Sequence, residues 1–376
     1  MMTKTPIAAA AAACKVWTRS ATPCVFGRSV YELLRTNNGE HAAHHSPSTS
    51  SELSQTYHCD RMLVDFEENE DGSVVLTPST RKTKIETNDK PKNRRIPLGR
   101  ARDCPTLTRR AFEDDKSDRR RRPFVSLAVV GMVVATEEKE GDSSSMIGTG
   151  VSSLLITRRP SYMRSFPGAF VFPGGNVDAE DESLEFALSR EIFEETGLVV
   201  SEDSWKLECL WESIYPTHLP TLEDEKLSTT ADGNEDEPLP DGAIKAHHLV
   251  CYFSGRPQNQ RKREQKSNTS LNLCREEVDG AVWMSRDNIR DLLEATSLIE
   301  ADRDLGLPAI VKEQTIVLQT GSSTTNQSKD ILLSDLVGIY PRLDVTYSRF
   351  CGMAQGSLFA LEEFVRNNPT TRIETE

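Results

Sequence analysis

The sequence has few of the residues that build a large hydrophobic core. Aromatic residues occupy only 6% of its 376 positions, whereas charged residues occupy 27%. It also lacks an apolar run of the roughly 18 residues that a membrane-spanning helix needs. The apolar segment at residues 125–135 is shorter and rich in β-branched residues, which is typical of a strand. We therefore expect one sizeable folded core with long appendages, and no membrane as a partner.

Paired cysteines and an excess of positive charge are also absent. The eight cysteines include no Cys-x-x-Cys pair and no cluster with histidine, which argues against a zinc site and for a reducing compartment. The chain carries 45 Lys and Arg against 58 Asp and Glu, which gives a net charge of −13. This charge argues against nucleic acid as a partner, so an anionic substrate needs a metal ion or a local basic patch.

The first 120 residues differ in composition from the rest. Residues 1–35 contain five basic residues and a single acidic one, in a setting rich in Ala, Ser and Thr. This composition is typical of an organellar transit peptide and predicts the mitochondrion or another organelle. The alternative is a disordered basic tail on a cytoplasmic protein. Residues 36–120 lack sustained periodicity and predict a disordered basic and polar linker.

After residue 120 the pattern changes, and residues 121–300 are the predicted folded domain. Segments rich in β-branched residues predict strands at 124–136, 151–159, 168–175, 204–215, 245–254 and 278–284. Helices are expected at 182–196, at 287–295 and, within a C-terminal extension over 301–376, at 356–367. Inserted loops are expected at 217–243 and 256–274. Strands in a mixed sheet with helices on both faces give an α/β/α sandwich, so the predicted fold class is α/β.

The helix at 182–196 carries acidic residues where a helix disfavours them. Glu191, Glu194 and Glu195 stand at positions i, i+3 and i+4, so they share one helix face near the end that Gly197 marks. Like charges at this spacing repel one another, and the last turn of a helix prefers cations. Arg190 can pair with Glu194, but two carboxylates are left without a helical partner. A positive charge from outside the helix is therefore expected.

A solvated charged face is the alternative explanation for these acids. The apolar residues of the same helix argue against it, because they form one stripe at Leu184, Leu188 and Ile192 and a second, opposite stripe at Phe186 and Phe193. A helix that is apolar on two sides is packed on two sides, which places its acidic strip in a cleft. Hard oxygen ligands that converge in a cleft suit Mg²⁺ or Mn²⁺.

Residues 175–198 resemble the Nudix box. Its second half, Arg-Glu-hydrophobic-x-Glu-Glu-x-Gly-hydrophobic, is matched without a break by residues 190–198. The first half has one extra residue between Gly175 and Glu182, so either Asp181 takes the place of the first glutamate or the loop is longer by one residue. The resemblance implies a Nudix-type sandwich and the hydrolysis of nucleoside diphosphates linked to another moiety.

The resemblance also implies roles for single residues. Arg190, Glu191, Glu194 and Glu195 form the implied catalytic set, in which Arg190 orients the glutamates. The metal would bridge diphosphate oxygens and activate a water molecule. Gly174 and Gly175 let the backbone approach metal and phosphate. The implied metal ligands are Gly175, through its carbonyl oxygen, together with Glu191, Glu194, Glu195 and Glu277, with Glu276 as the alternative to Glu277 as a ligand or general base.

Residues 155–175 resemble the signature of those Nudix enzymes that act on coenzyme A. Arg159, Arg164 and the Phe-Pro-Gly-Gly sequence at 172–175 are in register with that signature, whereas Pro160 stands where Ser or Ala is expected. Both arginines are predicted to bind the 3′-phosphate or the diphosphate, because guanidinium groups suit phosphate. The alternative is that each arginine pairs with a surface carboxylate.

The sequence therefore predicts a metal-dependent hydrolase with a small nucleotide-diphosphate substrate. The leading hypothesis is hydrolysis of coenzyme A or acyl-coenzyme A, which gives 3′,5′-ADP and 4′-phosphopantetheine. The alternatives are a diphosphatase for dinucleotides, ADP-ribose or capped RNA, and a nucleotide-binding module without catalysis. The three box glutamates argue against the non-catalytic module. The sequence makes no prediction about the oligomeric state.

Overall fold

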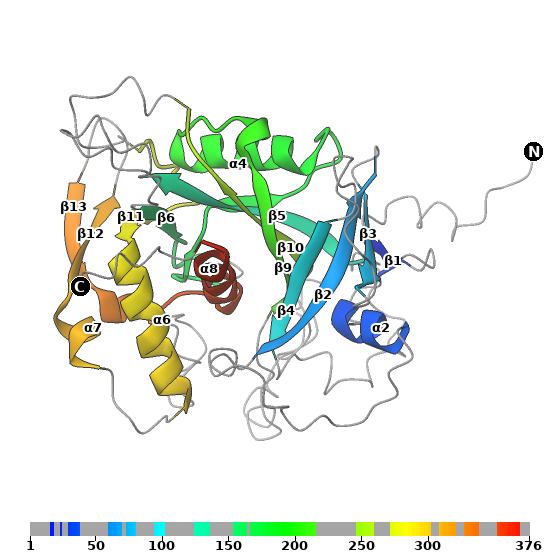
Figure 1. Ribbon diagram of the computed structural model, residues 1–376. Helices are drawn as coiled ribbons and strands as arrows, with labels where there is room; N and C mark the ends of the chain where they lie inside the picture. Colours follow the sequence, from blue (N-terminus) through cyan, green and yellow to red (C-terminus); the bar gives the residue numbers. More distant parts are fainter. Residues whose placement is uncertain are drawn as a thin grey trace, which may run out of the picture. The chain divides into compact units, whose positions relative to one another are not determined.

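The computed structural model describes two compact units of the chain (Figure 1). The described residues are 16–18, 23–24, 29–37, 59–69, 73–79, 94–101, 124–135, 153–163, 166–215, 246–258, 271–301, 308–320, 327–337 and 352–368. Unit 1 contains those between 16 and 127 and between 212 and 250, and unit 2 contains those between 128 and 211 and between 251 and 368. Strands β9 (Lys206–Tyr215) and β10 (Ala246–Gly255) contribute residues to both units.

In its described residues, unit 1 contains four neighbouring strands of the sheet and an α-helix that contacts them. Its strands are β1 (Val16–Thr18), β2 (Cys59–Glu68), β3 (Val74–Pro78) and β4 (Arg94–Ala101). Strand β1 pairs with β3 in parallel, and β2 pairs antiparallel with both β3 and β4. Helix α2 (Val30–Asn37) contacts β3 and β4.

Strands β2, β3 and β4 lie within residues 36–120, so the predicted disordered linker is wrong at these positions. Val64 and Phe66 of β2 are buried, while Asp65 and Glu67 between and beside them point toward solvent. Alternation of this kind is the pattern of a strand with one buried face. The charged residues of the outer face and of the flanking segments made the average composition polar, which concealed the alternation.

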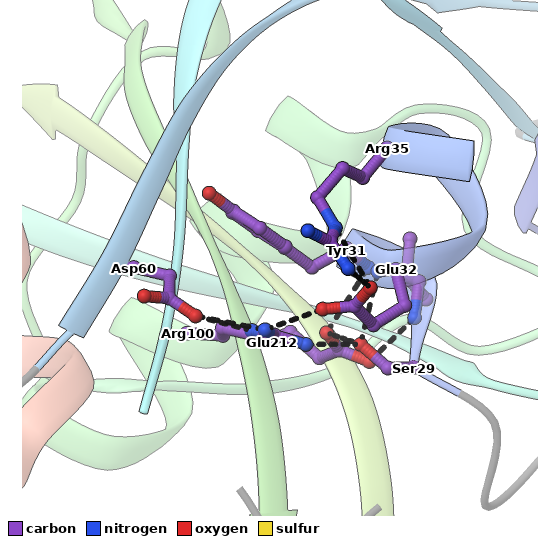
Figure 2. A network of polar contacts seen from close by, with 8 residues as sticks. Ser29, Tyr31, Glu32, Arg35, Asp60, Arg100 and Glu212 are labelled. Atoms are coloured by element: carbon purple, nitrogen blue, oxygen red, sulfur yellow. Dashed lines mark hydrogen bonds and ion pairs between the residues drawn. The ribbon is translucent and has the colours of Figure 1, made fainter. Parts of the chain in front are cut away.

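A buried carboxylate, that of Glu212 on β9, holds the N-terminus of α2 (Figure 2). It accepts hydrogen bonds from the hydroxyl of Ser29 at 2.8 Å, from the N–H of Val30 at 2.6 Å and from the N–H of Tyr31 at 3.2 Å. The Nε2 atom of His247 lies 3.1 Å from Glu212 Oε1, and both side chains are fully buried. Burial acts to raise the pKa of Glu212, but the contacts with His247, Val30 and Ser29 outweigh it and lower that pKa. A charged carboxylate therefore faces the positive end of the helix dipole.

A buried guanidinium group, that of Arg100 on β4, links the same helix to β2 (Figure 2). It donates to Asp60 at 2.7 Å, to Glu32 at 2.6 Å and to the hydroxyl of Ser29 at 3.1 Å, and it lies 4.4 Å from the centre of the Tyr31 ring. Two carboxylates and an aromatic face offset the desolvation of this side chain, which is only 4% exposed. Arg100 is thus committed to the core of unit 1.

The described N-terminal residues are part of folded unit 1. Residues 16–18 form strand β1, the N–H of Cys24 donates to the carbonyl of Val16 at 2.9 Å, and residues 29–32 contact Glu212 and Arg100. Cleavage after residue 35 would remove β1 and most partners of two buried charges. The order of these described residues contradicts the alternative of a disordered tail at these positions, whereas the transit peptide stays a prediction. The cellular location stays a prediction.

We expect Glu212→Gln to destabilise unit 1, because an amide has no charge to offer the N–H groups of α2. The free energy of unfolding should fall by about 1.5–3 kcal/mol, the range for a hydrogen bond to a charged group. Urea unfolding followed by circular dichroism measures the change. Glu67→Gln, at an exposed position on β2, is the matched control. Equal unfolding midpoints for the two variants would contradict the anchoring role.

In its described residues, unit 2 contains further strands and four α-helices. The strands are β5 (Ser126–Ala135), most of which lies in unit 2, β6 (Ser153–Arg158), β7 (Phe170–Val171), β8 (Gly174–Asn176), β11 (Gly280–Ser285), β12 (Thr315–Thr320) and β13 (Gln327–Leu332). The helices are α4 (Leu184–Thr196), α6 (Arg286–Ala301), α7 (Ala309–Glu313) and α8 (Gln355–Asn367). Strand β6 pairs with β11, β11 pairs with β12, and β12 pairs with β13, all antiparallel. Strand β5 pairs antiparallel with β6 and with β8. Among the described residues no helix combines the length and apolarity needed to cross a bilayer.

The strands of the chain pair in both senses, which confirms the predicted mixed sheet. In Figure 1, α4 lies on one side of the strands of unit 2, and α6 and α8 lie on the other. Helix α4 packs closely on β5, since a Cβ atom on Gly131 would lie 2.9 Å from Ile192 and 3.0 Å from Trp205. On α8, a Cβ atom on Gly356 would lie 2.7 Å from the Trp211 ring. The predicted arrangement of helices on both faces is thus confirmed in unit 2.

The C-terminal extension contains more than the predicted helix. Helix α8 confirms the one expected at 356–367, and α6 continues to Ala301 rather than ending near 295. Strands β12 and β13 were not predicted, although on β12 the buried Ile316 and Leu318 flank the exposed Val317 in the alternation of a strand. The loop expected at 217–243, and most of the loop expected at 256–274, lie outside the described residues.

Candidate active site

Helix α4 holds the acidic residues of the site, and the sequence sets both of its ends. The hydroxyl of Ser183 caps the N-terminus by accepting a hydrogen bond from the N–H of Phe186 at 3.0 Å. Gly197 ends the helix in the left-handed conformation, with φ 72°, and its N–H donates to the carbonyl of Phe193 at 2.9 Å. The predicted helix, with its end at Gly197, is confirmed.

Only one apolar side of α4 is packed. Leu184, Leu188 and Ile192 are fully buried, whereas Phe186 is 37% exposed and Phe193 is 57% exposed. The prediction that α4 packs on two sides is therefore wrong. The acidic residues are enclosed by a turn of main chain and by a second segment of unit 2 instead.

The turn is formed by two glycines that lie directly against the helix carboxylates. The N–H of Gly174 donates to Oε2 of Glu195 at 3.1 Å. Gly174 has φ 147°, and a Cβ atom there would lie 2.2 Å from the carbonyl oxygen of Val129. At Gly175 a Cβ atom would lie 2.5 Å from the carboxylate of Glu191. At Gly174 only glycine permits this approach, because main chain lies opposite it, whereas at Gly175 a side chain would displace the Glu191 carboxylate.

The second segment is the turn before β11, which adds a third carboxylate. The N–H of Cys274 donates to the main-chain carbonyl of Glu195 at 3.0 Å, so this turn follows the end of α4. Glu191, Glu195 and Glu277 each place a carboxylate oxygen within 4.8 Å of the others. Of the two predicted alternatives, Glu277 joins the group and Glu276 does not.

Burial raises the pKa of two of these carboxylates. Burial raises the pKa of Glu195 to about 8, with further contributions from Glu191 and Glu277, while the N–H of Gly174 and the charge of Arg159 act in the opposite direction. Burial also raises the pKa of Glu191. A divalent cation can replace the proton, and carboxylate oxygens are the ligands that Mg²⁺ and Mn²⁺ prefer. The residues present therefore fit the predicted metal ion.

Arg190 orients Glu191 and is itself held in place. Its Nη1 donates to Glu191 at 3.0 Å and to Glu194 at 3.3 Å, while its Nε and Nη2 donate to the two carboxylate oxygens of Asp181 at 3.1 and 2.9 Å. Burial acts to raise the pKa of Asp181, but the contact with Arg190 lowers it. Glu182 is exposed. Of the two alternatives for the first acidic position of the Nudix box, Asp181 and Glu182, it is therefore Asp181 that contacts Arg190.

The other predicted residues differ in their placement. Glu194 lies outside the group of three carboxylates, with a side chain that is 51% exposed. Arg159 lies near enough to Glu195 and Glu277 that their charges act to raise its pKa, although burial acts more strongly and lowers it. Arg164 lies outside the described residues. Arg159 is thus a cation near the carboxylates in the described part of the site, besides Arg190.

These features define the class of site: an α/β unit in which a helix, a glycine turn and a loop bring carboxylates together for a divalent cation. Residues 128–303 match the family model described as NUDIX domain. Residues 128–303 of this chain are therefore a NUDIX domain.

Named relatives match part of the chain. The m7GpppN-mRNA hydrolase NUDT17 of Danio rerio is 29% identical over 216 residues, which cover 57% of this chain and 62% of that protein. The protein of the same name from Homo sapiens is 30% identical over 137 residues, which cover 36% of this chain and 34% of that protein. The matches thus span less than two thirds of these relatives. A solved MutT/nudix family protein from Enterococcus faecalis aligns at 16% identity with a TM-score of 0.30, covering 64% of this chain and 61% of that one.

We expect Asp181→Asn to weaken metal binding through Arg190. A side-chain amide has no charge and a single oxygen, so it cannot accept both hydrogen bonds that Arg190 donates to Asp181. Affinity for Mn²⁺ should fall about 10- to 100-fold, the range for loss of a group that orients a metal ligand. Glu182→Gln is the matched control, one residue away and exposed. Electron paramagnetic resonance of free Mn²⁺ measures both affinities. A control variant as weak as Asp181→Asn would show that this orienting contact is unimportant.

Proposed function

We propose that the chain hydrolyses a phosphoric anhydride in a nucleotide, and that the 5′ cap of RNA is its first candidate substrate. The convergence of Glu191, Glu195 and Glu277 in a NUDIX domain carries the proposal of hydrolysis. The proposal of a cap substrate rests on the relatives named m7GpppN-mRNA hydrolase, which match this chain over part of its length. The phosphate chain written ppp in that name consists of phosphoric anhydrides.

The chain's own residues have distinct tasks in this proposal. Glu191, Glu195 and Glu277 hold Mg²⁺ or Mn²⁺, which when bound neutralises phosphate charge and makes water a better nucleophile. The N–H of Gly174 keeps Glu195 in position at 3.1 Å. Arg190 keeps Glu191 in position, and it also contacts Glu194 at the exposed side of the site. Two of the three proposed ligands, Glu191 and Glu195, are thus held in position by neighbouring groups.

Arg159 is the proposed contact for substrate phosphate. It follows β6, and the proposal is supported by the pKa of its guanidinium group, which burial lowers while the charges of Glu195 and Glu277 act to raise it. A guanidinium group there can donate to an oxygen of a phosphate whose neighbouring oxygens face the cation.

Coenzyme A or acyl-coenzyme A is the second candidate substrate. The observation that favours it is the resemblance of residues 155–175 to the coenzyme A signature, in which Arg159, Arg164 and the turn at 172–175 are in register. Its diphosphate offers the same anhydride to the same carboxylates. Hydrolysis of this substrate gives 3′,5′-ADP, whereas hydrolysis of a cap gives a 7-methylguanosine phosphate, so the products separate the two candidates.

The net charge of −13 argues for recognition of the cap end rather than of the RNA backbone. A cap dinucleotide, m7GpppG, should therefore be hydrolysed about as well as a capped RNA of 20–30 nucleotides, to within roughly tenfold. A strong preference for the longer RNA would indicate a basic surface outside the described residues.

The test incubates the full chain and Mg²⁺ or Mn²⁺ with m7GpppG, capped RNA, coenzyme A, an acyl-coenzyme A and ADP-ribose, with products separated by chromatography. We expect hydrolysis of one class, reduced at least about 100-fold in Glu195→Gln and in Glu277→Gln and retained in Glu182→Gln. Release of 7-methylguanosine phosphate would support the cap as the substrate. Release of 3′,5′-ADP would instead support coenzyme A as the substrate. No turnover of any compound would contradict hydrolysis and favour a nucleotide-binding module.

A further inference from the structure

Tyr162 combines an exposed ring with a fixed hydroxyl group. Its side chain is the most exposed of the large hydrophobic and aromatic side chains in the described part of the chain, at 68%. Yet its hydroxyl lies 3.1 Å from the carbonyl oxygen of Arg275 and 2.9 Å from that of Glu276. An exposed tyrosine usually places its hydroxyl in water and its ring against the protein. Here the hydroxyl is held by main chain while the ring is open.

The contact places Tyr162 at the edge of the carboxylate site. Glu276, whose carbonyl it contacts, is the neighbour in sequence of Glu277, one of the three converging carboxylates. On the other side, Tyr162 follows Arg159 by three residues in a turn closed by a hydrogen bond of 3.2 Å from the N–H of Met163 to the carbonyl of Pro160. Tyr162 therefore joins the turn that follows Arg159 to the segment that leads into Glu277.

An aromatic ring fixed in this way is prepared for stacking. Its orientation is set by the hydroxyl contacts and by the turn, so little side-chain entropy is lost when a flat ligand covers it. Stacking of a nucleobase on an aromatic side chain accepts any base, because every base has a π face. An aliphatic group on the same ring would gain only the burial of apolar surface. A phosphate group would gain no favourable contact with the ring face.

We propose that Tyr162 is the platform on which a nucleobase of the substrate stacks while the adjoining phosphates face Arg159 and the carboxylates. This assignment rests on the proposed function, since it requires a nucleotide substrate. It makes Tyr162 a determinant of specificity for nucleotides over other phosphate esters. The hydroxyl contacts give it a second effect, which is to tie the turn at 160–163 to the segment that carries Glu277.

A thermodynamic cycle between the base and the ring tests the proposal. Isothermal titration calorimetry with Mg²⁺ compares 7-methylguanosine 5′-monophosphate and AMP with ribose 5-phosphate, which lacks the base, for the full chain and for Tyr162→Ala. We expect the full chain to bind at least one nucleotide roughly 5- to 150-fold more tightly than ribose 5-phosphate. Tyr162→Ala should lose that advantage and bind ribose 5-phosphate within about twofold of the parent chain.

Tyr162→Phe separates stacking from the tie to the main chain. It keeps the ring, so it should retain most of the preference for the base, whereas Tyr162→Ala should not. A preference that persists in Tyr162→Ala, an equal loss for all three ligands, or a parent chain without preference would each overturn the proposal. Monophosphates contain no anhydride, so the cycle needs no turnover. A chain that passes this test but hydrolyses nothing would overturn the proposed function alone.

Discussion

The candidate site depends on one unfavourable interaction, the repulsion among the carboxylates of Glu191, Glu195 and Glu277. At separations below 5 Å like charges repel by about 1 kcal/mol per pair in water and by several times more where water is excluded. Glu195 is only 6% exposed, so the stronger repulsion applies to its carboxylate. Burial raises the pKa of Glu195 to about 8. Either a proton or a divalent cation relieves the repulsion, and the cation can in addition coordinate phosphate oxygens.

The surrounding fold keeps these carboxylates together against their repulsion. The N–H of Gly174 holds the Glu195 side chain at 3.1 Å, and the N–H of Cys274 holds its main chain at 3.0 Å. Arg190, held in turn by Asp181, does the same for Glu191. The arrangement is organised before the cation binds, so binding should stabilise the folded chain by mass action. The exposed ring of Tyr162 is tied to the same turn that supplies Glu277.

Local sequence patterns predicted the helix α4, its end at Gly197, the glycine turn and the shared helix face of Glu191 and Glu195, because each depends on residues close in sequence. What they could not decide depends on distant segments. The choice of Asp181 over Glu182 is made by the position of Arg190, and the choice of Glu277 over Glu276 by the turn before β11. Unit 1 was missed for the same reason: its strands are held by a buried network around Glu212 and Arg100, whose partners lie far apart in the chain.

The most direct test of the account is to locate the metal ion. Anomalous diffraction from crystals of the full chain grown with Mn²⁺ identifies the ion independently of any activity. The account predicts at least one Mn²⁺ bound by carboxylate oxygens of Glu191, Glu195 and Glu277, next to the turn at Gly174 and Gly175. Mn²⁺ bound elsewhere, with these three carboxylates left without an ion, would contradict it.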